Sequence, residues 1–407
     1  MTTPVYVLGG WQSDFAERGV DFASLLGTAT ANALLDAKID ASEIQVAHVG
    51  NFIGELTMFQ GQLGGVLASV DPAFADLPSG RHEGACASGS LAVLGAMADL
   101  EAGRYDVALV IGAEILRNKG GQVAAELLSC AGWSGDETDL GTSLWPIQFA
   151  EIADEYDRRY GVKHEHLGRI AEVNFENARR NPSAQTRSWD IVDGAFGDDD
   201  ALNPQVHGLL RKMDCSRITD GAAAIVLVSG RVAASYAAAR GTSVDSLPRI
   251  KGWGHRTAPM KLEDKLALGK DSEYLFPHVR RAAVEALGRA GMPDVFSVDA
   301  VEVHDCFTIS EYVAIDHLGL TGPGESWKAI EDGTIEMEGK VPINASGGLL
   351  GLGHPVGATG IRMVLDAAKQ VTNQAGEYQV SGARNVATSN IGGSLTTVVD
   401  FIIGVDD

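Results

Sequence analysis

Three short stretches of the 407-residue chain hold side chains that could carry out nucleophilic chemistry. Cys86 lies in HEGACASGS (82–90), His354 lies in GLGHPVGATG (351–360), and EVHDCF (302–307) holds His304 and Cys306. A thiol at the start of a helix is close to free N–H groups and to the positive end of the helix dipole, so we expect a lowered pKa for Cys86. An imidazole held in a glycine-rich loop can take the proton from such a thiol. Together these side chains predict nucleophilic catalysis at a cysteine.

The same residues also allow a metal site, which would use His304, Asp305 and His354. Metal ligands usually form a clearer cluster, and no two cysteines have C-x-x-C spacing, so we expect no metal ion. Alternation along a strand would place His304 and Cys306 on one face and Asp305 on the other. The glycines around His354 do not match a dinucleotide-binding or phosphate-binding loop. We expect them to let backbone segments approach each other closely.

The overall composition limits the classes of partner and compartment. Asp and Glu number 54 against 32 Lys and Arg, a formal net charge of −22, which argues against nucleic acid as the main partner. A small anionic ligand needs only a local basic patch and stays compatible with this charge. Four cysteines in a chain of this length do not predict a disulfide framework and favour a reducing, cytoplasmic location. No apolar run predicts a membrane span, and the N-terminal residues do not resemble a signal peptide.

The elements that must position these residues alternate between strand and helix, which predicts parallel βαβ units. In the first part we expect strands at 4–10, 44–52 and 106–115, with helices at 21–37 and 87–101. A strand at 220–229 follows a charged, turn-rich segment. The order then repeats, with strands at 248–254, 298–307 and 385–393 and helices at 276–292 and 353–370. This internal duplication gives Cys86 and His354 equivalent places, each just ahead of a helix in its own half.

The duplication and the segment between the repeats suggest three units. Residues 1–117, completed by 216–247, form the first half, and residues 248–407 form the second. Residues 118–215 form an inserted loop domain. We expect an α/β fold in which the two halves stack face to face as αβαβα layers, with the helices after Cys86 and His354 in the central layer.

The motifs resemble those of the thiolase superfamily, specifically the sterol-carrier-protein-2 type, over essentially the whole chain. GACASG around Cys86 is similar to the thiolase nucleophile segment. CSRITDGAAAIVLVS (215–229) resembles the stretch that re-enters the first half after the loop domain. NASGGLLGLGHPVGATG (344–360) is similar to the family's long N-x-x-G-G…G-H-P-x-G-x-x-G run, and HDCF (304–307) marks the subtype.

The resemblance implies an acyl-CoA C-acyltransferase that condenses acyl groups or cleaves 3-ketoacyl-CoA. Cys86 would hold the acyl group, and His354 would take its proton and face the thioester oxygen. His304 would be a second donor to that oxygen, and Cys306 would be the acid/base for the carbon acid. The backbone N–H groups of Cys86 and Gly392 would form a second oxyanion hole. No cofactor is implied, because the coenzyme A thioester is the substrate.

The chain departs from the family at one place, where many thiolases carry a C-x-G cysteine. Here the stretch reads SNIGGS, and Asn390 stands at that position. The carbon-acid chemistry would then depend on Cys306. Three alternatives remain open: another condensing enzyme such as a ketoacyl or hydroxymethylglutaryl-CoA synthase, a partner-dependent aldolase or lyase, and a non-catalytic acyl-CoA or lipid carrier. An H-G-T-G-T motif is absent, which argues against a ketoacyl synthase, and the presence of Cys86 argues against the lyase.

Further expectations concern the substrate and the assembly. The coenzyme A phosphates would meet basic residues of the loop domain, namely Arg179, Arg180, Arg187, Arg211 and Lys212. Trp145, Trp189 and Phe175 are candidates for an acyl tunnel, although aromatic residues more often belong to a core. The resemblance implies a homodimer or a dimer of dimers, and a small accessory protein is a candidate partner.

Overall fold

The computed structural model describes residues 3–139 and 141–406. Its main sheet has nine strands in the order β3-β2-β4-β7-β1-β8-β11-β10-β9. The strands of the first half are β1 (Val5–Gln12), β2 (Val46–Gly50), β3 (Ser79–His82), β4 (Val107–Glu114) and β7 (Gly221–Ser229). Those of the second half are β8 (Arg249–Thr257), β9 (Ala300–Val303), β10 (Asn385–Gly392) and β11 (Thr397–Gly404).

The two halves repeat one topology, which confirms the predicted duplication. In each half a parallel pair, β2 with β4 or β9 with β10, continues into antiparallel pairs that end at β1 or β8. The place of β3 is taken in the second half by an isolated bridge between Val301 and Ile343. The hydrogen bonds correspond, because Ala47 N–H donates to the Pro78 carbonyl at 2.9 Å and Val301 N–H donates to the Pro342 carbonyl at 2.9 Å. β1 and β8 join the halves through the single pair Tyr6–Arg249.

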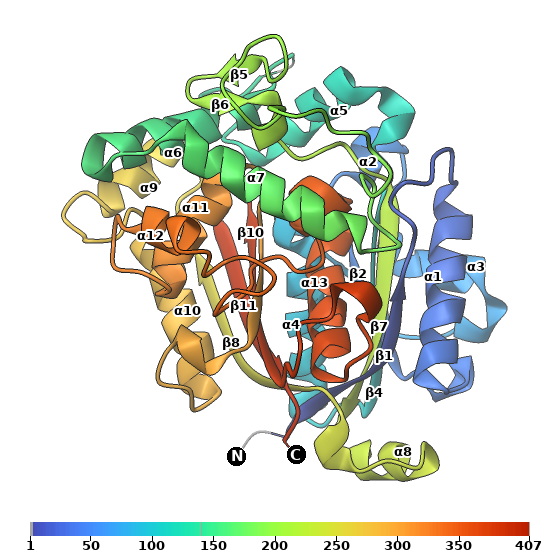
Figure 1. Ribbon diagram of the computed structural model, residues 1–407. Coiled ribbons are helices and arrows are strands. Elements are labelled where there is room, and N and C mark those ends of the chain that lie inside the picture. The colour runs from blue at the N-terminus through green and yellow to red at the C-terminus, as the bar shows by residue number, and fades with distance from the viewer. Residues whose placement is uncertain (1–2, 140, 407) are drawn as a thin grey trace.

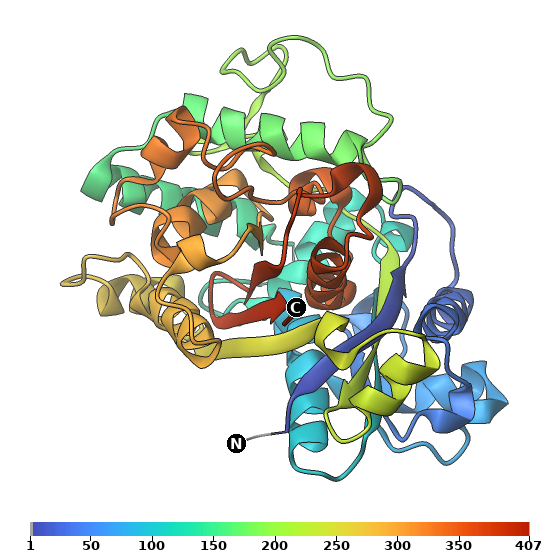
Figure 2. The ribbon, with the colours of Figure 1, turned by 60° about the horizontal axis from the view of Figure 1, so that its bottom comes forward.

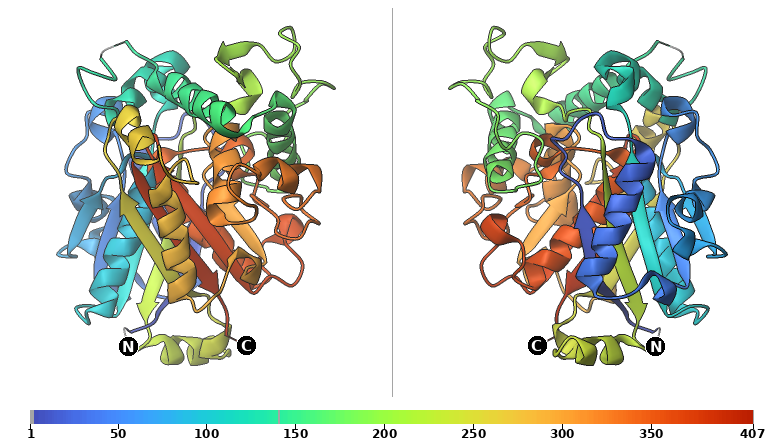
Figure 3. Two further views of the ribbon diagram at one scale, coloured as in Figure 1. Left: turned by 90° about the vertical axis from the view of Figure 1, so that its left-hand side faces the viewer. Right: turned by 90° about the vertical axis from the view of Figure 1, so that its right-hand side faces the viewer.

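The layers follow from which face of each strand is apolar. Helices α4 (Ser88–Glu101) and α13 (Val356–Val371) lie between the two groups of strands (Figures 1 and 2). α1 (Phe22–Ala37) covers the outer face of the first half, and α10 (Pro277–Arg289) covers that of the second (Figure 3). Alternate residues of β4 confirm this arrangement, because Ala108 and Val110 face the central core while Leu109 and Ile111 face the α1 side. The structure therefore has the expected αβαβα layers.

The segment between β4 and β7 is mainly helical. It contains α5 (Gly121–Leu128), α6 (Leu144–Tyr160), α7 (His164–Arg179) and a short hairpin of β5 (Gln205–His207) and β6 (Leu210–Arg211). These elements lie at the top of the molecule in Figure 1, and both α6 and α7 pack against α11 (Thr308–Leu318) of the second half. The remaining helices are short: α2 (Gly54–Thr57), α3 (Val66–Val70), α8 (Ala233–Ala239), α9 (Leu262–Leu268) and α12 (Ser326–Glu331).

Two predicted elements differ from the structure near the site. The strand expected at 298–307 ends at Val303, and α11 begins at Thr308. Every residue of α11 is buried, so it lacks the amphipathic pattern by which a surface helix is recognised. The helix expected at 353–370 begins at Val356, after a π-helical turn over Gly348–Leu352.

No helix within residues 3–139 and 141–406 combines the length and the apolar character needed to cross a bilayer.

Candidate active site

Cys86 lies in a 3₁₀ turn, Ala85–Ala87, that leads directly into α4. Ser88 fixes this turn, because its Oγ donates to the Ala85 carbonyl at 2.6 Å and accepts from Gly84 N–H at 3.1 Å. Burial raises the pKa of the Cys86 thiol to about 12, and the backbone N–H of Gly393 opposes this shift. The expectation of a lowered pKa is therefore wrong. Desolvation outweighs the helix terminus, and Cys86 is a neutral thiol that needs a base.

His354 is the base placed beside Cys86. Its backbone N–H donates to Thr219 Oγ1 at 3.0 Å, and its ring Nδ1 lies 2.7 Å from Thr359 Oγ1. The Thr359 hydroxyl points its proton at the Pro355 carbonyl, 3.4 Å away, which leaves its oxygen to accept from Nδ1–H of His354. Burial lowers the pKa of His354 to about 3. The neutral ring therefore carries its proton on Nδ1 and presents the lone pair of Nε2 to the site.

His304 has the opposite tautomer. Its Nδ1 lies 2.9 Å from Nδ2 of Asn390, and Oδ1 of Asn390 accepts from Ser90 Oγ at 2.7 Å. An amide nitrogen can only donate, so Nδ1 of His304 accepts and Nε2 carries the ring proton. Burial lowers the pKa of His304 well below its usual value, and the nearby His354 adds to this effect. His304 is thus a neutral hydrogen-bond donor.

The two histidines meet Cys86 at one point. Their rings lie 5.0 Å apart, nearly perpendicular, and Cys86 Sγ and one nitrogen from each ring all lie within 4.8 Å of one another. Nε2 of both rings is buried and has no hydrogen-bond partner among the described residues. Two buried and unpartnered nitrogens that converge on a thiol leave room for polar atoms of a substrate.

Cys306 completes the predicted set. Its carbonyl accepts from Ser216 N–H at 2.9 Å, and its Sγ lies 3.6 Å from Ser310 Oγ. Burial raises the pKa of Cys306 well above its usual value, and the adjacent Cys86 adds to this. Asp305 points away, because its carboxylate accepts from the backbone N–H groups of Leu349 and Leu350. The predicted division of faces is therefore correct, although the strand has already ended at Val303.

The cavity at this site has a volume of about 210 Å³. Cys86, Cys306 and His354 line it, together with Gly393, which follows the predicted oxyanion residue Gly392. Most of the remaining wall is apolar: Phe52, Ala85, Leu116, Ala125, Leu128, Trp145, Pro146, Phe149, Ile218, Phe307 and Val356. Trp145 thus lines the cavity, and its contact with an acyl chain stays a prediction. Phe175 is core, and Trp189 packs against Phe175.

The basic residues predicted to bind coenzyme A lie outside this cavity. Arg187 pairs with Asp14 at 2.7 Å, and Arg211 pairs with Asp200 at 2.7 Å. Arg179, Arg180 and Lys212 are exposed. Their role toward coenzyme A stays a prediction.

Three groups support the site: the sequence reasoning missed Thr359 and Glu114, and it noted Asn390 without its contact to His304. Asn390 and Thr359 set the two tautomers. Glu114, at the end of β4, accepts from the backbone N–H groups of Phe52 and Gly357 at 3.0 and 3.1 Å. It thereby fixes the start of α13 to the end of β2, and burial raises its pKa to about 7. An acid that ends a continuous apolar run was the sequence signal for Glu114.

A further cluster of three charged residues is buried near the histidines. Arg362 of α13 is fully buried and bonds Glu302 at 2.9 Å and Asp366 at 3.2 Å. The positive charge of Arg362 helps to keep the pKa values of His304 and His354 low.

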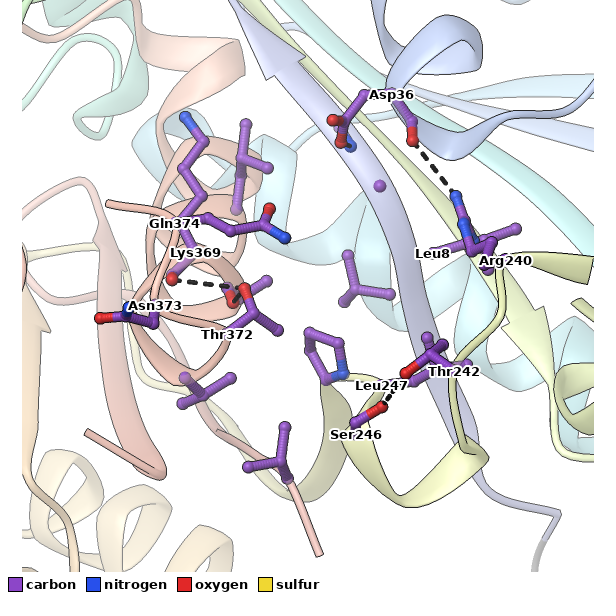
Figure 4. A pocket seen from close by; sticks show the side chains of 18 of the residues that line it. Leu8, Asp36, Arg240, Thr242, Ser246, Leu247, Lys369, Thr372, Asn373 and Gln374 are labelled. Carbon is purple, nitrogen blue, oxygen red and sulfur yellow. Dashed lines mark hydrogen bonds between the residues drawn. The ribbon is translucent and has the colours of Figure 1, made fainter. Parts of the chain in front are cut away.

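A larger cavity, of about 730 Å³, lies between β1 and the C-terminal end of α13 (Figure 4). No cysteine or histidine is among the described residues that line it. Figure 4 shows Arg240 bound to the backbone oxygen of Asp36 at the end of α1. This cavity therefore offers no group for acyl transfer.

A metal ion could in principle use Cys86, His304 and His354, since their ligand atoms lie close together. The tautomers oppose this, because Nε2 of His304 carries a proton and Asn390 occupies its Nδ1. The absence of a metal stays a prediction.

Comparison with known proteins is consistent with this geometry. Residues 5–231 match the family described as thiolase, N-terminal domain, and residues 261–405 match the family described as thiolase C-terminal domain-like. An acetyl-CoA acetyltransferase of Methanothermobacter thermautotrophicus is 31% identical over 98% of both chains. The benzoylsuccinyl-CoA thiolase subunit BbsB of Thauera aromatica is 30% identical over 96% of this chain and 94% of its own.

Solved structures show the same fold. The Ltp2-ChsH2(DUF35) aldolase superposes with a TM-score of 0.77 at 21% identity, covering 99% of this chain and 98% of that one. An acetyl-CoA acetyltransferase from Syntrophomonas wolfei superposes with a TM-score of 0.68 at 18% identity over the full length of both.

Proposed function

The chain belongs to the thiolase family, and we propose that it transfers acyl groups between coenzyme A thioesters through an acyl-Cys86 intermediate. The observation that carries this mechanism is the convergence of Cys86 with two histidines of opposite tautomer beside Cys306. Acyl transfer to a neutral thiol needs an adjacent base, and Claisen chemistry needs fixed donors for a thioester oxygen.

The acylation half-reaction follows from the protonation states. Nε2 of His354 takes the proton from the neutral Cys86 thiol, and the thiolate attacks the thioester carbonyl. The N–H groups of Cys86 and Gly392 would stabilise the tetrahedral oxyanion. The coenzyme A thiolate leaves, takes the proton from His354 and departs as the free thiol, while the acyl group stays on Cys86.

The step that forms or breaks the carbon–carbon bond uses Cys306 and His304 together with His354. In condensation, Nε2 of His354 first takes the proton of the neutral Cys306 thiol, and the Cys306 thiolate then takes a proton from the α-carbon of acetyl-CoA. The enolate oxygen accepts hydrogen bonds from Nε2–H of His304 and from Nε2–H of the protonated His354. The enolate carbon then attacks the acyl-Cys86 carbonyl, and the Cys86 thiolate leaves and takes the proton back from His354. In the cleavage direction the steps reverse, and the neutral Cys306 thiol protonates the departing enolate carbon.

The test is acyl labelling of Cys86. Incubation with acetyl-CoA and longer acyl-CoAs, followed by peptide mass spectrometry, should show an adduct on the Cys86 peptide that is absent in Cys86→Ala. Cys306→Ala should keep the adduct and lose carbon–carbon bond formation. If no donor labels Cys86, the mechanism is wrong and the carrier or partner-dependent lyase takes its place.

We propose in addition that the protein is cytoplasmic and forms a homodimer or a dimer of dimers. Light scattering, which measures the molar mass in solution, tests the oligomeric state. All four cysteines are free, which supports a reducing compartment. Leu56 of α2 and the nearby Phe59 are 45% and 97% exposed, and together they form an apolar surface that supports an interface near α2. A DUF35 partner is named for one neighbour of the same fold. A small accessory protein is therefore a candidate partner here.

A further inference from the structure

Arg217 lies at the catalytic cavity, on a short segment that contacts the Cys306 segment on one side and the His354 segment on the other. Ser216 N–H donates to the Cys306 carbonyl at 2.9 Å. On the other side, Ile218 pairs with His354, and Thr219 Oγ1 accepts from His354 N–H at 3.0 Å. The backbone of Arg217 is thus fixed within two residues of contacts to both catalytic segments, and Arg217 is among the residues that line the cavity with Cys86.

The guanidinium of Arg217 has no acidic partner among the described residues. Its Nη2 lies 3.3 Å from the weak acceptor Met213 Sδ, and its Cζ lies 5.5 Å from the centre of the Trp189 ring. Its Nε is buried and makes no hydrogen bond. Burial lowers the pKa of Arg217 below its usual range, but an arginine stays charged in a protein. Charges withdrawn from solvent are normally paired, and this partly buried one has no anion beside it among the described residues.

The surroundings make this cation unusual. Arg217 is the only Lys, Arg, Asp or Glu among the described residues that line the cavity, and the wall is otherwise mostly apolar. The chain as a whole has an excess of acidic residues, so an unpaired arginine here is not a consequence of composition. The pocket is suited to an anion that arrives with the substrate.

We propose that Arg217 binds a carboxylate on the acyl chain, so that the substrates are acyl-CoA thioesters of dicarboxylic acids. This rests on the proposed function, because it places the acyl group in the cavity beside Cys86. A carboxylate would accept two parallel N–H bonds from the guanidinium, including the one from Nε that is now unmade.

The other anionic groups of the substrate are the phosphates of coenzyme A, which lie beyond the pantetheine arm from the thioester. At about 210 Å³ the cavity is smaller than the roughly 300–1,000 Å³ of pockets that enclose a whole drug-sized ligand. It has room for a thioester with a short acyl chain. The acyl carboxylate is therefore the anion that reaches Arg217.

A matched pair of substrates tests this assignment. 3-Oxoadipyl-CoA and 3-oxohexanoyl-CoA have six-carbon acyl chains that differ in a terminal carboxylate against a methyl group. With coenzyme A the first gives succinyl-CoA and acetyl-CoA, and the second gives butanoyl-CoA and acetyl-CoA. The wild-type enzyme should prefer 3-oxoadipyl-CoA in kcat/KM by on the order of 100-fold, since the apolar chain leaves Arg217 unpaired.

Substitution of Arg217 distinguishes carboxylate binding from other roles of this residue. Arg217→Met should remove the preference, losing 3-oxoadipyl-CoA activity on the order of 100-fold while activity on 3-oxohexanoyl-CoA is kept or increased. Arg217→Lys should keep part of the preference, because it keeps the charge without the planar fork. Arg281→Met removes an exposed arginine from α10 and should leave the preference unchanged.

Three kinetic results, and one labelling result, would overturn the assignment. The kinetic results are a wild-type enzyme that does not prefer 3-oxoadipyl-CoA, an equal loss on both substrates in Arg217→Met, and a raised KM for coenzyme A alone in that variant. The last two would indicate phosphate binding. Labelling of Cys86 by butanoyl-CoA but not by succinyl-CoA would refute the carboxylate and leave the thiolase mechanism intact. Labelling by neither would refute the mechanism itself.

Discussion

At the residue scale, the protonation states of two histidines decide what each can do. His304 and His354 are both buried and neutral, and only their Nδ1 partners differ: Asn390 donates to one, and Thr359 accepts from the other. The same side chain therefore acts as a donor at one position and as a base at the other. Asn390, which stands where many thiolases have a cysteine, acts here through His304.

Asn390→Leu should impair the carbon–carbon step and spare acylation. The leucine keeps the volume but removes the donor, so His304 is no longer held with its proton on Nε2. We expect kcat for condensation to fall on the order of 100-fold, as for loss of one oxyanion donor, while Cys86 still becomes acylated. Rapid-mix mass spectrometry measures acylation, and a coupled assay measures condensation.

A pH profile separates this positioning role from a structural one. In Asn390→Asp the new carboxylate should raise the pKa of His304, so that the ring is a cation and keeps its Nε2 proton at low pH. Condensation should be partly restored below the new pKa and lost as the pH rises through it. Equal loss of acylation and condensation in both variants, at every pH, would show that Asn390 only maintains the structure.

At the element scale, glycines let α4 and α13 meet in the central layer. A Cβ on Gly360 would lie 2.1 Å from Ser90 Oγ and 2.7 Å from Asn390 Oδ1. A Cβ on Gly357 would lie 2.7 Å from the Gly50 carbonyl. The sequence expectation that these glycines serve close backbone approach is confirmed. The contact also carries the hydrogen bond from Ser90 to Asn390, so packing of the helices and orientation of His304 depend on each other.

Gly360→Ala should therefore damage both stability and chemistry. The methyl group would overpack the contact and lower the free energy of unfolding by about 1–3 kcal/mol, and displacement of Ser90 should reduce condensation. Gly288→Ala in α10 is the matched control, because nothing lies within 4 Å of its Cβ. It should raise stability by up to about 1 kcal/mol. Urea unfolding of both variants measures the change in the free energy of unfolding. Equal effects would mean that the contact between α4 and α13 can accommodate an added methyl group.

At the scale of the whole molecule, folding buries carboxyl groups that then resist ionisation. Asp400 of β11 is 2% exposed, and it lines a small cavity beneath Ala283 and Leu287 of α10. Burial raises its pKa to about 7, with Ser389 opposing. The folded state thus holds this proton more tightly than the unfolded chain. Its contribution to stability is present below the usual carboxyl pKa and is lost as the pH rises through about 7.

Asp400→Asn should remove this dependence. Relative to the wild type, the variant should gain stability between pH 5 and pH 8 by on the order of 3 kcal/mol, because only the wild type must bury a charge at the higher pH. Thermal or urea unfolding at the two pH values measures the gain. Asp190→Asn, at an exposed position, should show no such change. A gain at both pH values alike would indicate packing and not titration.

The sequence by itself determined the repeated strand and helix order and the nucleophilic set of Cys86, His304, Cys306 and His354. These are local properties: apolar periodicity reports burial, and a reactive group next to small residues and glycines is visible in a short stretch. The duplication then fixed which residues occupy equivalent positions, and so which would meet.

Only the tertiary structure decided the electrostatics of the site. The low pKa of His354 and the high pKa of Cys86 arise from burial by segments hundreds of residues apart, which reverses the expectation drawn from the helix terminus alone. The proton positions depend on Asn390 and Thr359, and the missing partner of Arg217 is recognised only once the whole cavity wall is known. Desolvation and hydrogen bonding depend on neighbours in space, and a linear pattern does not contain them.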